Sequence, residues 1–321
     1  MVDTLTSGAS CGGSHPLSGL LVVDKPQGPT SHDIVYRMRR TLRADAIGHA
    51  GTLDPMASGV LVLAVGEATK LVFWLTAHEK SYEATIGLGS ATDTLDAEGV
   101  EVDRRPLGAD LRKALRSAGG PQLDPAVAAA LDAERARTMQ VPPQFSAIRT
   151  NGRRAFARAR RGECTPLPAR QVAVHRLELI GYDDDPPSLT VSVVASKGYY
   201  VRALGRDLAE ALGTCGHLTS LRRTRSGPFT LEEAVGADID REEALARIQP
   251  IASVAARVLR IARLSANGAR DAHHGRAVRA ADIAAEAPGP SAWLDESGTL
   301  VAIGEIDADG RGRVIRGFAG R

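Results

Sequence analysis

The sequence has no long apolar run of the kind that crosses a membrane. Its longest apolar stretches, residues 59–65 and 189–195, match the length of buried strands, whereas a membrane-spanning helix needs about 18 or more such residues. The first 19 residues also lack the basic start and apolar stretch of a secretory signal. We therefore expect a cytoplasmic protein without a membrane partner.

Cysteine and aromatic residues are scarce as well. The three cysteines, Cys11, Cys164 and Cys215, lie far apart and form no CxxC pair, which argues against a disulfide scaffold and a structural zinc site. An aromatic content of 4% argues against an RNP-type platform for stacking RNA bases. The glycine-rich segments have neither Walker A nor GxGxxG spacing, so we expect no metal and no cofactor.

The sequence does contain enough apolar residues for a core, together with an excess of arginine. Its 321 residues are 43% hydrophobic and 24% charged, which is typical of a globular chain of about two domains. The formal net charge is only +2, yet 35 of the 40 basic residues are arginine. Either the base composition of the gene or phosphate recognition by the planar guanidinium explains this excess. The placement of the arginines decides between the two.

Patterns along the chain divide it into three parts. Residues 1–18, rich in Gly and Ser, are expected to form a flexible leader, and residues 19–250 a long body. Residues 251–321 are expected to form a small β-rich module, with turns at Asn267-Gly268, Ser297-Gly298 and Asp309-Gly310. In the body, apolar periodicity predicts strands over residues 19–24, 59–65, 80–88, 171–182, 189–196 and 221–228, and helices after Thr30 and over 68–77, 106–138 and 200–212.

The segment with the densest set of potentially reactive residues is GHAGTLDPMASG, residues 48–59. Its glycines allow tight backbone paths and the close approach of a ligand. Asp54 is followed by Pro55, which disfavours helix at the aspartate. A plain Asp-Pro turn that leads into the next strand explains the same residues without any function.

The segment KSYEATIGLG, residues 80–89, is followed by a turn rich in carboxylates. Alternation puts Tyr82 on the apolar face of a strand, where ordinary core packing is the alternative to a function. For Asp93, Asp96 and Glu98 in the turn, a solvated turn is favoured over a glycosidase-like acid pair with Asp54.

A third segment, SKGYYVRALGRDL at residues 196–208, carries Arg202 in the first turn of a predicted helix. The helix dipole disfavours a cation there, so a carboxylate or phosphate partner is expected. A surface arginine in an arginine-rich protein is the plainer alternative.

Arginines also cluster in two places, with Phe145 and Phe156 interleaved in the first. Such clustering is the electrostatic footprint of a nucleic-acid surface. The first cluster contains Arg149, Arg153, Arg154, Arg158, Arg160 and Arg161, and the second contains Arg222, Arg223 and Arg225.

Taken together, these segments closely resemble the TruB-type tRNA pseudouridine-55 synthases. The resemblance covers roughly residues 19–234 and rests on four segments in the family's order. The family often has Thr at the positions of Ala50 and Ser58, which are mild changes. The matching segments are GHAGTLDPMASGVL, KSYEATIGLG with TDTLDAEG, VPPQFSAIRTNGRRAF, and SKGYYVRALGRDL with HLTSLRRTRSG.

The resemblance implies isomerisation of uridine 55, in the T-loop of tRNA, to pseudouridine, without metal or cofactor. It implies an α+β fold with a mixed, largely antiparallel central sheet flanked by helices and a small C-terminal β-rich PUA-like domain over residues 251–321. The catalytic domain would span residues 19–250, with a basic RNA-binding insertion at about 141–172. The expected partner is the T-arm of tRNA, bound by a monomer without an obligatory protein partner.

The resemblance also assigns roles to single residues. Asp54 matches the family's catalytic aspartate, Tyr82 the tyrosine that packs on the target base, and Arg202 the arginine paired with the aspartate. His49 matches a loop histidine that meets the RNA, whereas Tyr200 and Leu221 match positions that line the pocket. The remaining substrate-binding candidates are Lys25, Arg153 and Arg154.

These roles agree with the chemistry of the residue types. A base inside a stacked loop must be flipped out, and aromatic stacking offsets much of that cost. Asp54 must be ionised to act as a nucleophile; burial opposes ionisation, and a nearby Arg202 favours it. A carboxylate can attack the sugar C1′, attack the base or abstract a sugar proton, and the residues leave these routes open.

Two other classes of function remain alternatives. A hydrolase using Asp54 with Asp93 or Asp96 would release free uracil or cut a glycoside. A non-catalytic RNA-binding or tRNA-chaperone protein would explain the basic clusters and the C-terminal module, but it would leave the pairing of Asp54 with Arg202 without a purpose.

Overall fold

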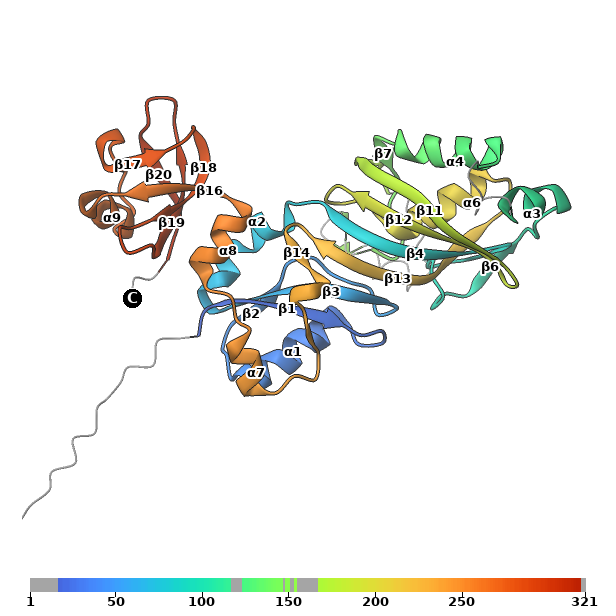
Figure 1. Cartoon of the computed structure of the whole chain (residues 1–321), viewed down its shortest axis with the longest axis horizontal. Coiled ribbons are helices and arrows are strands. Elements are labelled where there is room, and N and C mark those ends of the chain that lie inside the picture. The colour runs from blue at the N-terminus through green and yellow to red at the C-terminus, as the bar shows by residue number, and fades with distance from the viewer. Residues whose placement is uncertain (1–16, 117–122, 147, 151–152, 155–166, 319–321) are drawn as a thin grey trace, which may run out of the picture.

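A nine-stranded mixed sheet forms the centre of the larger part of the computed structural model, which describes residues 17–116, 123–146, 148–150, 153–154 and 167–318 (Figure 1). The strand order is β11-β12-β4-β13-β3-β1-β15, with β14 paired to β13 and β2 paired to β3. Within this sheet β1 with β15 and β13 with β3 run parallel, and the other pairs are antiparallel. The strands are β1 Gly19–Lys25, β2 Ile47–His49, β3 Ala57–Val65, β4 Lys80–Leu88, β11 Val174–Asp184, β12 Pro187–Ala195, β13 Gly216–Ser226, β14 Phe229–Thr230 and β15 Val235–Gly236.

Helices flank this sheet and join its strands, which confirms the predicted α+β fold (Figure 1). Apolar residues of α1 and α6 share one core cluster with β4 and β13. The helices are α1 Ser31–Leu42, α2 Val72–Thr76, α3 Ala109–Arg116, α4 Pro125–Arg135, α6 Val201–Ala211, α7 Arg241–Ala246, α8 Ile251–Val258 and α9 Ala266–His273, with short 3-10 turns η1 Gly66–Leu71, η3 Leu231–Glu233 and η4 Ala280–Asp282.

Helix α1 shows how local sequence sets these elements. Thr30 and Asp33 form a capping box, in which each side chain accepts from the other's backbone N–H. Ile34 and Met38 are fully buried on the inner side of the helix, as their spacing predicts. Arg43 takes a left-handed conformation, with φ of 53°, and ends the helix. The helix starts beside the loop that carries Asp54, because the hydroxyl of Ser31 is bonded to the backbone of Leu53.

Two of the predicted helices are not continuous α-helices in the structure. The segment over 68–77 is a 3-10 turn followed by the short α2, and the segment over 106–138 contains two separate helices, α3 and α4. At the end of the first turn the N–H of Val72 donates to the carbonyl of Thr69, three residues earlier, which is the 3-10 pattern and not the α-helical one. Periodicity alone does not separate these cases.

The C-terminal module has its own five-stranded sheet, in the order β17-β16-β18-β19-β20 (Figure 1). This confirms the predicted small β-rich module, whereas the exact domain bounds stay a prediction. Trp293 is fully buried at its centre, against the backbone of Gly304, where a Cβ would lie 2.0 Å from the indole ring. The strands are β16 Arg260–Leu264, β17 Ile283–Ala285, β18 Gly289–Leu294, β19 Leu300–Ile306 and β20 Gly312–Gly317.

One of the three turns predicted in this module is wrong. The Asn267-Gly268 pair lies inside α9, whose first turn is capped by the Ser265 hydroxyl accepting from the N–H of Gly268. A Cβ on Gly268 would lie 2.5 Å from the Asp282 carbonyl oxygen, so glycine allows a close approach of two chain segments there. The turns at Ser297-Gly298 and Asp309-Gly310 are confirmed, with positive φ at each glycine.

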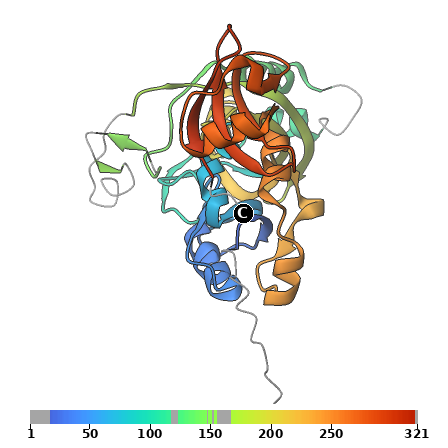
Figure 2. The ribbon, with the colours of Figure 1, turned by 90° about the vertical axis from the view of Figure 1, so that its left-hand side faces the viewer.

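Short two-stranded ladders complete the described chain. Strands β5 Ser90–Thr92 and β6 Glu101–Arg104 form one ladder, and β7 Met139–Gln140 and β10 Arg170–Gln171 another. The hairpin of β8 Arg149–Thr150 and β9 Arg153–Arg154, light green in Figure 2, projects from the side of the body. Within the described ranges, no helix is long and apolar enough to span a membrane.

Candidate active site

The loop that carries Asp54 connects β2 to β3 at the middle of the large sheet. The carbonyl of Asp54 accepts from the N–H of Ala57, so the loop turns directly into β3. The hydroxyl of Ser31, the first residue of α1, donates to the carbonyl of Leu53 at 3.0 Å and accepts from its N–H at 2.9 Å. The sequence motif is therefore a structured loop fixed to a helix N-terminus.

Two buried cations donate to backbone carbonyls of this loop, of the start of β3 and of the turn beside the loop. Lys25, fully buried at the end of β1, donates to the carbonyls of Pro26 and Pro29, both at 2.8 Å, and more weakly to that of Pro55 at 3.4 Å. Arg223, 1% exposed on β13, donates to three further carbonyls. These belong to Gly51 at 3.0 Å, Thr52 at 3.3 Å and Val60 at 2.7 Å. Arg223 therefore fixes the backbone on both sides of Asp54. Lys25 fixes mainly the turn at residues 26–29, where the N–H of Gly28 donates to the carbonyl of Pro55.

Arg202 contacts Asp54 directly, as the sequence predicts. The Nε of Arg202 lies 2.9 Å from Oδ2 of Asp54, and Arg202 is the second residue of α6. Its Nη1 lies 3.2 Å from Oδ2 of Asp96 and donates to the carbonyl of Thr94, and its Nη2 donates to the carbonyl of Phe145. With a side chain only 7% exposed, Arg202 is held rigidly by two carboxylates and two carbonyls.

The electrostatic balance at Asp54 favours a carboxyl group that holds its proton more tightly than usual. Burial raises the pKa of Asp54, and the adjacent Asp96 adds to this rise. Arg202 and Lys25 act in the opposite sense and limit it. The expectation that Arg202 favours ionisation is thus right in direction, although the pKa of Asp54 still lies above its ordinary value.

Asp96 is the main site residue that the sequence interpretation misplaced. The turn around it was expected to be solvated, but Asp96 is 3% exposed and accepts from the hydroxyl of Thr94 at 2.6 Å and from the N–H of Glu98 at 3.1 Å. Asp93, by contrast, is exposed and accepts only from the backbone of Val100 among the described residues. Alternation and composition do not reveal that Arg202, more than a hundred residues later in the chain, pairs with Asp96.

Tyr82 and Leu221 lie on adjacent strands of the sheet. Tyr82 is half-buried on β4 and packs against the main core, and it pairs across the sheet with Arg223. Leu221 is buried on β13, in register with Ala57 of β3 and Ala84 of β4. Leu221 is therefore placed beside the start of β3, just after the Asp54 loop.

His49 and Tyr200 flank this region. His49 ends β2, stacks edge-on against His32 at 5.4 Å between ring centroids, and has a buried Nδ1 without a partner among the described residues. Burial lowers the pKa of His49, which favours the neutral ring. Tyr200 is half-buried before α6, and burial raises the pKa of its hydroxyl. Its backbone N–H donates to the side chain of Gln140 at 2.8 Å.

The remaining predicted binding residues fall into two groups. The ammonium of Lys25 is buried against backbone, so contact with substrate stays a prediction for it. Arg153 and Arg154 form β9 in the projecting hairpin, and their side chains lie outside the described residues, as do Arg158, Arg160 and Arg161. The β7–β10 ladder brings the two ends of segment 141–172 together, as expected for an insertion.

The second arginine cluster is not the free RNA surface that the sequence suggests. Arg222 pairs with Asp24 at 2.7 Å, Arg223 is buried, and Arg225 pairs with Glu79 at 2.5 Å. Their guanidinium groups bind partners from distant parts of the chain, which sequence clustering cannot reveal. In the described residues, no group of three His, Cys, Asp or Glu side chains is placed to hold a metal.

Comparisons with known proteins place this chain among the pseudouridylate synthases. A model of the TruB family pseudouridylate synthase N-terminal domain matches residues 39–201, and a model of the tRNA pseudouridylate synthase B C-terminal domain matches residues 202–248. A chain from a crystal structure of a Cbf5-Nop10-Gar1 complex shares the fold, with a TM-score of 0.68 and 24% identity over 94% of this chain and 84% of that chain.

Similar relatives extend over most of the sequence. The tRNA pseudouridine synthase B of Thermobifida fusca is 43% identical over 308 residues, 94% of this chain and 99% of the relative. That of Nocardia farcinica is 51% identical over 230 residues, 71% of each chain. The chain therefore belongs to the TruB family of pseudouridylate synthases, which confirms the resemblance seen in its four segments.

Proposed function

We propose that this protein converts uridine 55 in the T-loop of tRNA to pseudouridine, with Asp54 as the nucleophile. The observation that carries the proposal is the 2.9 Å pair between Arg202 and Asp54 in a chain of this family. The reaction breaks the bond between N1 of uracil and C1′ and forms a bond between C5 and C1′, while a proton leaves C5 and another is gained at N1. Atoms and electrons balance within the nucleotide, so the proposal needs no cofactor.

The environment of Asp54 suits such a step. Its side chain is 36% exposed, whereas that of Arg202 is 7% exposed, so the carboxylate is partly accessible while its cationic partner is buried. The guanidinium favours the ionised carboxylate that a nucleophile requires. Because Asp96 shares the same guanidinium, Arg202 is fixed in position before substrate arrives.

The target nucleotide would have to leave the stacked loop before reaching Asp54. Flipping costs a few kcal/mol, and stacking on an aromatic side chain returns about 1–3 kcal/mol per base. Tyr82 is the proposed stacking partner, with Tyr200 and Leu221 lining the pocket. His49 is proposed to meet the RNA where the base has left, and its neutral ring is suited to packing between bases.

Segment 141–172 is proposed to bind the T-arm, with Arg153 and Arg154 in contact with phosphate groups of the RNA. The segment is tied to the site itself, because the carbonyl of Phe145 accepts from Arg202 at 2.8 Å. We also propose that the protein acts on tRNA as a monomer in the cytoplasm. Monomeric state and location stay predictions from the sequence.

The test pairs wild type with Asp54→Asn on an unmodified tRNA transcript, with pseudouridine mapped by carbodiimide labelling and primer extension. We expect a stop at uridine 55 with wild type and none with Asp54→Asn. Asp93→Asn is the matched control, because Asn keeps an oxygen that accepts from the Val100 N–H, and it should behave as wild type.

Other outcomes redirect the proposal. Turnover by Asp54→Asn at the wild-type rate contradicts the nucleophile. Release of free uracil indicates a hydrolase, since isomerisation keeps the base attached. Tight tRNA binding by wild type without any stop favours an RNA-binding protein, and stops only at other uridines keep the chemistry but change the substrate site.

A further inference from the structure

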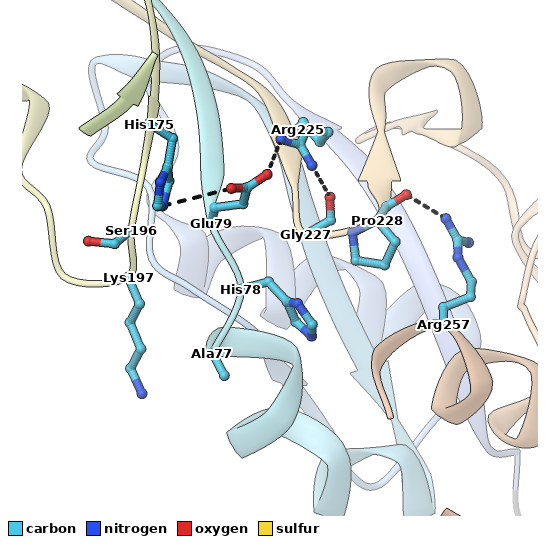
Figure 3. Close-up of a pocket in the computed structure, with 10 residues that line it drawn as sticks. All are labelled: Ala77, His78, Glu79, His175, Ser196, Lys197, Arg225, Gly227, Pro228 and Arg257. Carbon is cyan, nitrogen blue, oxygen red and sulfur yellow. Dashed lines mark hydrogen bonds and ion pairs between the residues drawn. The ribbon is translucent and has the colours of Figure 1, made fainter. Parts of the chain in front are cut away.

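Tyr200 follows a turn whose middle is exposed. The turn joins β12 to α6 and passes a cavity of about 500 Å³, which Ser196 and Lys197 help to line (Figure 3). Lys197 and Gly198 are exposed, and Gly198 takes a positive φ of 89°. Within the turn, the N–H of Tyr199 donates to the carbonyl of Ser196 at a long 3.3 Å. The turn alone therefore gives Tyr200 little support.

The side chain of Gln140 supplies that support from another part of the chain. Its Oε1 accepts from the backbone N–H of Tyr200 at 2.8 Å, and its Nε2 donates to the carbonyl of the same residue at 3.2 Å. The amide thus pairs with both polar groups of one residue, as a neighbouring strand would. Gln140 is 2% exposed on β7, and its backbone pairs with Arg170 of β10. A buried side chain at the base of segment 141–172 therefore holds Tyr200.

Tyr200 occupies an unusual position for a tyrosine. It has an extended backbone, with φ of −108° and ψ of 111°, and it directly precedes the first residue of α6. Ser, Thr, Asp and Asn are preferred at this position because their side chains cap the helix, and the side chain of Tyr200 makes no such bond. The ring of Tyr200 is therefore not used to build the helix that follows.

The preceding tyrosine is fixed on the other side of the chain. The hydroxyl of Tyr199 donates to Oε1 of Glu134 at 2.7 Å, and Tyr199 packs in the main core. Successive side chains of an extended segment point to opposite sides, so the ring of Tyr200 points away from Tyr199. Burial raises the pKa of the Tyr200 hydroxyl, and the charges of Arg202 and Asp54 also act on it. The ring of Tyr200 therefore lies near the Asp54–Arg202 pair.

We propose that Gln140 is a positioning residue for the reaction: its amide holds the backbone of Tyr200, so that the tyrosine ring lines the pocket beside Asp54 before RNA arrives. Among the described residues, the hydrogen bonds of the Gln140 side chain go to Tyr200, and Gln140 acts through it. The inference rests on the proposed function and on the place of Tyr200 in the pocket. A misplacement of about 1 Å can slow an enzyme about 100-fold, because the rate depends steeply on the alignment of the bound groups.

The experiment measures the single-turnover rate of the full-length enzyme on unmodified tRNA at saturating enzyme, which reports the steps after binding. Gln140→Met keeps the length of the side chain and removes both hydrogen bonds. We expect it to lower the single-turnover rate by about 10–100-fold. The affinity for tRNA should stay unchanged, and kcat and kcat/KM should fall equally in the steady state. A wild-type rate in Gln140→Met would overturn the proposal.

Gln140→Asn tests the same contact with a milder change. It keeps a polar amide, but its side chain is too short to reach both backbone groups of Tyr200, so the single-turnover rate should again fall, by less than in Gln140→Met. This variant also decides the question if Gln140→Met does not fold. A rate equal to that of wild type in a folded Gln140→Asn protein would contradict the positioning role.

Gln249→Met is the matched control. Gln249 precedes α8 and also makes two side-chain hydrogen bonds, since its Nε2 donates to Glu233 at 2.9 Å and its Oε1 accepts from Arg257 at 2.8 Å. It should keep the wild-type single-turnover rate, and urea unfolding compares the stability that each variant has lost. Equal slowing in Gln249→Met and Gln140→Met would attribute the effect to stability and would refute the proposal.

A double-mutant cycle with Tyr200→Leu tests whether Gln140 acts through the tyrosine ring. Tyr200→Leu keeps the backbone groups that Gln140 binds and removes the ring. Gln140→Met should therefore slow Tyr200→Leu much less than it slows wild type. Losses that simply add would show that Gln140 does not act through the ring, and the proposal would be wrong.

Failure of this inference is distinguishable from failure of the proposed function. If wild type forms pseudouridine at uridine 55 and Gln140→Met does so at the same single-turnover rate, the positioning role is wrong and the proposed function stands. If wild type forms no pseudouridine at that position, the proposed function fails, and the inference fails with it.

Discussion

Cations without a carboxylate partner occur in two regions of this protein, and burial separates what they do. Beside the Asp54 loop, the charged ends of Lys25 and Arg223 are buried and donate to backbone carbonyls. Beside the cavity of Figure 3, Lys197 is exposed and its donors point to solvent. A buried cation must have its donors satisfied, whereas an exposed one keeps them for a ligand.

Lys80 shows that a buried cation can have its hydrogen bonds satisfied and still lose part of its tendency to stay charged. It is 8% exposed at the start of β4, and its ammonium donates to the carbonyls of Thr76 at 2.7 Å and His78 at 2.6 Å. Burial lowers the pKa of Lys80 to about 8, and the neighbouring Arg223 and Lys197 add to the effect. Carbonyl partners thus satisfy the hydrogen bonds of a buried cation without fully compensating its charge.

The largest expected effect on stability comes from removing the buried guanidinium of Arg223. Arg223→Met leaves the carbonyls of Gly51, Thr52 and Val60 without this partner, and we expect a loss of about 3–5 kcal/mol in the free energy of unfolding. Urea unfolding measures it. Arg222→Met, on the same strand, breaks a partly exposed pair with Asp24 and a 3.3 Å bond to the hydroxyl of Ser58, and it should cost about 1 kcal/mol or less.

Removal of the exposed cation Lys197 is compared with removal of the buried Arg223. Lys197→Met should change stability by no more than about 0.5 kcal/mol. Equal losses for Arg223→Met and Lys197→Met would show that burial does not distinguish the two sets of cations.

A second prediction concerns pH and Lys80. Because the folded protein holds this proton less tightly than the unfolded chain, stability should rise as pH increases from about 8 to about 10.5, by up to about 3 kcal/mol. Lys80→Met should remove this component of the rise. The measurement is the free energy of unfolding at several pH values in that window, and an identical pH dependence in the two proteins would refute the assignment.

A smaller effect is expected on the acid side of the activity profile. Arg202 lowers the pKa of Asp54, so Arg202→Met should move the acid limb of kcat/KM to higher pH, by about one unit. The control is Arg206→Met, one turn further along α6, since Arg206 pairs with Asp207 at 2.7 Å. An acid limb that stays in place after loss of Arg202 contradicts the electrostatic role.

Sequence patterns predicted much of the fold, for physical reasons that are local. Alternation placed Tyr82 with Ala84, Ile86 and Leu88 on the core face of β4, and the structure puts all four in or against one core cluster. Helical spacing predicted α1, and the helix-dipole argument predicted a carboxylate or phosphate partner for Arg202, of which the structure shows the carboxylate. Each of these signals depends on neighbours within a few residues.

The errors in the candidate site concern contacts between distant segments. Burial of Asp96 depends on Arg202, and the structural role of Arg223 depends on carbonyls more than 160 residues earlier in the chain. The cluster of Arg222, Arg223 and Arg225 looked like an RNA surface because clustering records only proximity in sequence. The turn predicted at Asn267-Gly268 is wrong for a local reason, because Ser265 caps a helix that contains both residues, and the glycine there allows the close approach of Asp282.

The use of carbonyl oxygens to hold the Asp54 loop has a consequence for recovery from acid. Peptide carbonyls carry no proton to gain in the range where carboxylates titrate. A drop in pH that protonates Asp54 therefore leaves the hydrogen bonds from Lys25 and Arg223 to the backbone carbonyls intact. We expect activity to be lost at a higher pH than the one at which the loop unfolds. Neutralisation should then restore full turnover at once, without a slow refolding step.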